Sequence, residues 1–176
     1  MSLLSKLNSR LPKLTQVFPV YGLIVMLVYG WTIYWFAWNL PSWLGLMPLM
    51  DVFSILAYSF IANFLESIVV LSVVIVLGII LPEKWLRGDF VLIAGFVVLY
   101  FLIFGMFLLY NFIPLPQLGR SVMAAFSLFF IGQYAIRRFR LARKVIGTLA
   151  DRSVIFLYMS IPVTIVGLIV VLIRNI

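Results

Sequence analysis

The sequence contains no cysteine and no histidine, and charged side chains make up only 10% of its 176 residues. Without imidazole or thiolate, the chain cannot form a disulfide or use His or Cys to ligate haem, zinc or an iron–sulfur cluster. Nucleophilic catalysis by a Cys or His side chain is excluded for the same reason. The five acidic residues are scattered along the chain, so we expect no catalytic group, no metal site and no cofactor.

Apolar residues make up 65% of the sequence, and its mean hydropathy is +1.23; soluble proteins are about 45–50% apolar. Five apolar stretches approach the roughly 20 residues that a helix needs to cross about 30 Å of hydrocarbon. We therefore predict an all-α integral membrane protein, with residues 1–176 forming one bundle of five transmembrane helices. The expected spans are residues 17–40, 52–81, 90–113, 121–136 and 153–173.

Lysine and arginine are distributed unevenly between alternate connections of this bundle. The N-terminal segment has three, the link between spans two and three has two, and the link between spans four and five has six, eleven in all. The other side has only Arg120 and Arg174. Because cytoplasmic flanks are enriched in positive charge, we expect the N-terminus in the cytoplasm and the C-terminus outside.

The small size and simple topology favour the plasma membrane of a bacterium or archaeon. Residues 41–51 are expected to form a separate segment along the outer interface.

Glu66 is the one acidic residue that lies well inside an apolar stretch. An ionisable group inside hydrocarbon costs at least about 2.5 kcal/mol unless it is paired, neutralised or hydrated. At about 100° per residue, Ser59, Asn63 and Glu66 fall within about 60° of one helix face. We expect this polar stripe either to join the helix to a neighbouring helix or subunit, or to form a site for an ion, a proton or a cationic or hydroxylated solute.

Residues 137–144 form a basic segment with five cations, Arg137, Arg138, Arg140, Arg143 and Lys144. No Pro or Gly interrupts residues 137–146, so we expect the fourth helix to continue as a basic amphipathic extension on the cytoplasmic side. Such a helix lies in the headgroup layer with its apolar face down. The expected partners are anionic lipid headgroups, a phosphate-bearing ligand or a protein is the alternative, and nucleic acid is not expected.

The fifth span has small and hydroxylated side chains along one side, at Ser160, Thr164 and Gly167. Small residues at this spacing let helix backbones approach closely in a membrane. We expect these three residues to form a helix-packing face.

The chain shows no catalytic motif and leaves no room for a soluble domain. We therefore expect a non-catalytic subunit or scaffold of a larger membrane protein assembly, in contact with the lipid bilayer and with other subunits or further copies of itself. The alternative is a small ion or solute transporter or channel component, a homo-oligomer with a polar path through Glu66. A third class, a lipid-modifying enzyme with Glu66 as general base, requires a nearby hydroxyl or cation from another helix, which Ser127, Tyr134 or Arg138 of the fourth helix could supply.

Overall fold

The computed structural model of the chain describes residues 11–80, 89–111 and 115–175, and all regular structure in these ranges is helical. Helices α2, α3, α5 and α7 are long and apolar enough to span a membrane, which suggests a multi-pass membrane protein. The expected span at residues 121–136 lies in α6, which is less apolar than the other four. Five crossings therefore stay a prediction. The helices are α2 (Leu14–Leu44), α3 (Leu49–Ile80), α5 (Phe90–Asn111), α6 (Leu115–Arg138) and α7 (Arg140–Asn175).

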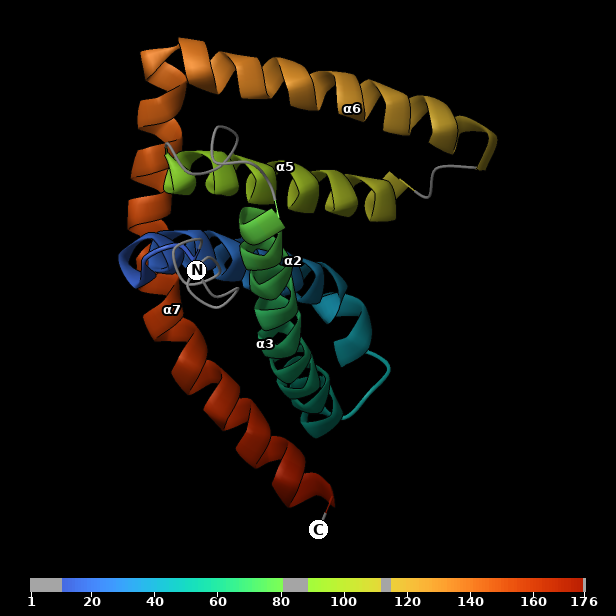
Figure 1. The fold of residues 1–176 in the computed structure, drawn as a ribbon. Coiled ribbons are helices and arrows are strands. Elements are labelled where there is room, and N and C mark those ends of the chain that lie inside the picture. The colour runs from blue at the N-terminus through green and yellow to red at the C-terminus, as the bar shows by residue number, and fades with distance from the viewer. Residues whose placement is uncertain (1–10, 81–88, 112–114, 176) are drawn as a thin grey trace.

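Helix α2 is the centre of the fold. It packs against α3, α5 and α7, while α5 lies between α2 and α6 (Figure 1). Val20, Leu23 and Ile24 of α2 have no exposed surface, and they meet Ala94 of α5 and Ala150 of α7 in the main apolar core. This core lies in the first half of α2, so the second half of the helix is free to carry partly exposed aromatic side chains.

Two close approaches bring α7 against its neighbours. A Cβ added at Gly22 of α2 would lie 2.8 Å from the backbone carbonyl of Ser153, so no larger residue fits there without a shift of the helices. A Cβ at Gly167 would lie 3.0 Å from the carbonyl oxygen of Ala57 in α3. Glycine at such positions lets helix backbones come near enough for extensive van der Waals contact.

The fourth helix does not continue through the basic segment, contrary to the sequence-based expectation. Helix α6 ends at Arg138, and α7 begins at Arg140 and leaves in a different direction (Figure 1). The turn at Phe139 lets both helices pack on α5, since Gly132 of α6 sits against the ring of Phe96 and Ile146 of α7 lies beside Gly95. A straight helix could make only one of these contacts. The basic extension is helical, but most of it belongs to the start of the last helix.

The expected helix ends also need correction. Helix α2 continues through Pro41 to Leu44, and α3 already begins at Leu49, so residues 41–51 are mostly helical. Proline costs least near a helix end, where few backbone hydrogen bonds are lost, and Trp43 packs edge-on against Phe36 with ring centroids 5.7 Å apart. The expected ends of the second and third spans, at residues 81 and 113, lie outside the described residues. Four cations used to predict the orientation, Lys6, Arg10, Lys84 and Arg87, lie outside the described residues.

Replacing Gly22 by alanine should destabilise the fold, because the new Cβ meets the Ser153 backbone and overpacking typically costs about 1–3 kcal/mol. Gly30 on the same helix is the matched control: nothing lies within 4 Å of its added Cβ, and Gly to Ala in a helix gains about 0.5–1 kcal/mol. Thermal unfolding in detergent, followed by circular dichroism, should show a lower midpoint for Gly22→Ala and an unchanged or higher one for Gly30→Ala. Equal midpoints would contradict the close approach of α2 and α7.

Candidate functional site

A buried hydrogen bond joins α2 to α7. The Tyr29 hydroxyl lies 2.7 Å from Thr164 Oγ1 and 3.3 Å from the carbonyl oxygen of Phe60 in α3. Thr164 also lies 2.8 Å from the carbonyl oxygen of Ser160, four residues earlier in α7. The hydroxyls of Tyr29 and Thr164 carry one proton each, so only two of these three contacts can be hydrogen-bonded at the same time. The arrangement ties three helices together at one point, with both side chains buried.

Two further polar contacts join α2 to α3. The Thr32 hydroxyl donates to Asn63 Oδ1 at 3.0 Å, and the hydroxyls of Tyr21 and Ser67 lie 3.3 Å apart. Asn63 is only 5% exposed, and its Nδ2 has no hydrogen-bond partner among the described residues. Tyr21, Tyr29 and Thr32 were not singled out in the sequence. Their common side of α2, within an apolar stretch, is the signal that could have found them.

The structure divides the polar stripe predicted on α3. Asn63 faces α2 in the interior, Ser59 is half-buried and donates to the carbonyl oxygen of Ile55 at 2.8 Å, and Glu66 is exposed on the surface of the helix bundle. Asn63 and Glu66 lie about 60° apart around the helix, so one can be on the buried face while the other lies just outside it. Glu66 makes no ion pair or hydrogen bond with the described residues.

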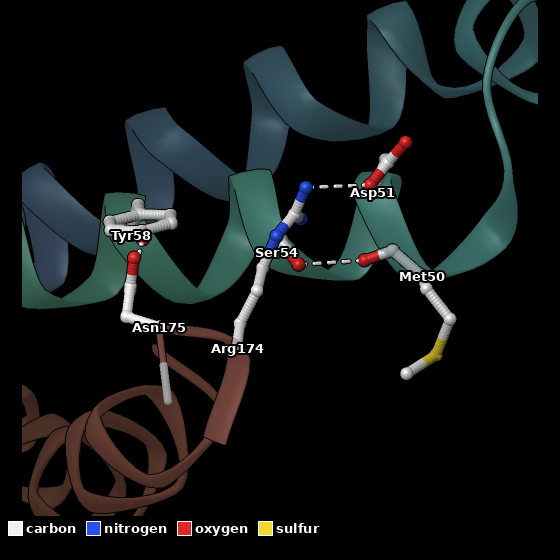
Figure 2. A network of polar contacts seen from close by, with 6 residues as sticks. All are labelled: Met50, Asp51, Ser54, Tyr58, Arg174 and Asn175. Atoms are coloured by element: carbon white, nitrogen blue, oxygen red, sulfur yellow. Dashed lines mark hydrogen bonds and ion pairs between the residues drawn. The ribbon is translucent and has the colours of Figure 1, made fainter. Parts of the chain in front are cut away.

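A groove of about 760 Å³ separates the first half of α3 from the second half of α7, and its walls are almost wholly apolar. One end is closed by an ion pair, with Arg174 of α7 2.7 Å from Asp51 in the first turn of α3. Asn175 donates to the Tyr58 hydroxyl at 2.8 Å beside it. Figure 2 shows both side chains reaching from the end of α7 to α3. Both partners of the ion pair are nearly half exposed, so it contributes no more than about 1 kcal/mol.

Two smaller hollows open elsewhere on the helices. A groove of about 560 Å³ lies between α5 and α6, beside the hydrogen bond from the Tyr100 hydroxyl to the carbonyl oxygen of Ala125. A cavity of about 270 Å³ lies between the second half of α2 and α3, and Ser59 is part of its wall. Glu66 is not part of the wall of any of these three hollows.

The basic segment stands largely open to the surroundings, although one of its cations is engaged. Arg143 forms an ion pair with Asp89, which immediately precedes α5. Arg137, Arg138, Arg140 and Lys144 are exposed and form no ion pair with the described residues. The turn between α6 and α7 therefore has four exposed positive charges on its surface.

The small-residue side of α7 lies against both α2 and α3. Ser160, Thr164 and Gly167 are all buried, with Thr164 bonded to Tyr29 and Gly167 in contact with Ala57. By contrast, Ser127, Tyr134 and Arg138 are exposed on α6, which packs on α5 and α7. The described structure thus offers no contact between these three residues and Glu66.

The chain matches no protein-family model, no curated protein sequence and no solved structure. Its function has to be inferred from its own residues.

Removing the Tyr29 hydroxyl should weaken the junction of α2, α3 and α7. Tyr29→Phe leaves Thr164 and the Phe60 carbonyl without this partner, and hydrogen bonds between membrane helices contribute about 0.6 kcal/mol on average and at most about 1.7. We expect the free energy of unfolding to fall within that range. Tyr34→Phe is the control, because Tyr34 is 49% exposed. Denaturant unfolding in mixed micelles measures both, and an equal loss would contradict a special role for Tyr29.

Proposed function

We propose that this chain is a non-catalytic subunit of a larger membrane protein assembly, and that the exposed side of α3 around Glu66 binds a partner helix. The observation that supports the proposal is the position of Glu66. It lies near the middle of a 32-residue apolar helix and is exposed on the side turned away from the other helices. A lone carboxyl group in hydrocarbon is costly, so contact with a partner that supplies a hydrogen bond or a charge would stabilise it.

The chemistry of the partner follows from what this chain lacks. Each described Lys or Arg lies before α2, in α6, between Arg140 and Arg152 at the start of α7, or at position 174. A second copy docked through the same side would place two Glu66 carboxyl groups together, without a cation from the middle of a span. We therefore infer that the partner is a different chain whose transmembrane helix offers Lys, Arg or an amide or hydroxyl donor at this depth.

The surroundings of Glu66 suit a packed helix. Exposed residues follow one another along α3 in alternating steps of four and three, the spacing by which one helix packs along another. The side chains beside Glu66 are apolar, with Leu65 59% and Val69 61% exposed. The residues of this surface, the α3 stripe, are Ala62, Glu66, Val69, Val73 and Val76.

Transport through a homo-oligomer is the second reading, and it would need a path that Glu66 lines between copies. Glu66 faces none of the three hollows described above. The assembly subunit is therefore the better supported function. We assign it to the plasma membrane of a bacterium or archaeon, in keeping with its size and simple topology.

Photo-crosslinking in the native membrane tests the partner. A photoreactive amino acid at Leu65 or Val69 should give one discrete protein adduct, whereas the same probe at Ile165 or Ile169, which are 52% and 50% exposed on α7, should not. Glu66→Lys should abolish the adduct and Glu66→Gln should reduce it severalfold, because Gln keeps a hydrogen bond but loses the charge.

Each outcome has a definite meaning once the thermal midpoint of each Glu66 variant shows that it is folded. Mass spectrometry of the adduct should identify a different chain. An adduct that is a second copy of this chain would overturn the proposal in favour of the homo-oligomer. Adducts to lipid alone, or equal adducts from α3 and α7, would overturn it as well.

The basic segment is proposed to hold anionic lipid headgroups, since Arg137, Arg138 and Arg140 are exposed and unpaired among the described residues. Changing all three to Gln should lower the retention of phosphatidylglycerol over phosphatidylcholine, because each cation near an anionic surface contributes about 1 kcal/mol. Native mass spectrometry counts the retained lipids. Arg120→Gln, which changes one exposed cation in α6 outside the segment, is the control, and a loss equal to that of the triple variant would contradict the assignment.

A further inference from the structure

The cavity of about 270 Å³ between α2 and α3 has a wall made mainly of aromatic rings. Trp31, Trp35, Phe36 and Trp43 all come from the second half of α2 and are all half-buried. The rings support one another, with centroids 6.0 Å apart between Trp31 and Trp35 and 5.7 Å apart between Phe36 and Trp43. Aromatic faces carry negative electrostatic potential, and four rings around one hollow therefore favour a positively charged guest.

The side-chain oxygens of the same wall can accept hydrogen bonds, and they lie beside the indole N–H groups of its tryptophans. The hydroxyl of Ser59 and one amide proton of Asn39 are each donated to a main-chain carbonyl four residues earlier, at 2.8 Å. The Thr32 hydroxyl is donated to Asn63 Oδ1. Oxygen lone pairs remain on all three side chains. No Lys, Arg, Asp or Glu is part of this wall, so a bound cation meets neither repulsion nor a fixed counter-charge.

We infer that this cavity binds a primary ammonium group. A cation over a tryptophan face is stabilised by about 0.5–2 kcal/mol, and the N–H groups of a primary ammonium can reach the oxygens of Thr32, Asn39 and Ser59. Tryptophan is common at the level of lipid headgroups, and the cavity lies towards one end of α2. The ammonium belongs either to the headgroup of an amino phospholipid or to a free small amine.

Tryptophan fluorescence measures the binding directly. Trp38, which is 69% exposed, is not part of the cavity wall. In the full chain carrying Trp38→Phe and Trp85→Phe, the three tryptophans left of five are all in the wall. Titration with methylammonium in a neutral detergent should change their emission in a saturable way, beyond a sodium chloride control of equal ionic strength.

Matched variants separate the cavity from general effects on the helices. Asn39→Leu and Ser59→Ala should each weaken ammonium binding at least tenfold. Asn111→Leu and Ser72→Ala are the controls, because each removes a side-chain hydrogen bond of the same kind and the same 2.8 Å length outside the cavity. Equal weakening in the cavity variants and their controls would overturn the inference.

Nanodiscs distinguish the two sources of the ammonium. Native mass spectrometry should find phosphatidylethanolamine retained over phosphatidylcholine, whose quaternary headgroup has no N–H to donate, and Asn39→Leu should remove the preference. That result assigns the ammonium to lipid. Saturable methylammonium binding without a lipid preference assigns it to a free amine. If the two lipids are retained equally and methylammonium gives no saturable response, the inference is overturned.

Discussion

The close approach of α7 to the backbones of α2 and α3 is the constraint on which the rest of the structure depends. Gly22 admits the Ser153 backbone at one level of α7, and Gly167 admits the Ala57 carbonyl at another. Inside a membrane the hydrophobic effect does not drive helices together, so packing and hydrogen bonds must do so. Only because these backbones lie so close can the Tyr29 hydroxyl reach Thr164.

Two polar residues in the same apolar part of α3 have different surroundings. Asn63 finds Thr32 as an internal partner, whereas Glu66, three residues later, is exposed and finds none among the described residues. A buried amide with a partner helps to specify which helices meet. A carboxyl group on the outer surface has no such partner within the described residues, and the proposed contact with another chain would supply one.

The positions of the long apolar helices could be predicted from the sequence. Where the helices end and which of their sides face one another could not. Hydropathy locates α3 and α5 because the bilayer fixes the length of apolar helix required. The turn at Phe139 has no Pro or Gly to mark it, and it exists because α6 and α7 both pack on α5. Periodicity places Ser59, Asn63 and Glu66 near one side of α3, yet it cannot say where the edge of the buried face passes, and the structure has Asn63 buried and Glu66 exposed. Tyr29 could have been noticed as polar, but its contact with Thr164 spans 135 residues.

That long separation has a consequence for biosynthesis. A helix leaves the ribosome in chain order, so α2 and α3 enter the membrane well before Thr164 and Gly167 are translated. Until then the Tyr29 hydroxyl and the surface around Gly22 lack their contacts in α7. Until α7 is made, α2 and α3 are therefore an incomplete intermediate, and the insertion of α7 supplies the contacts that join the three helices.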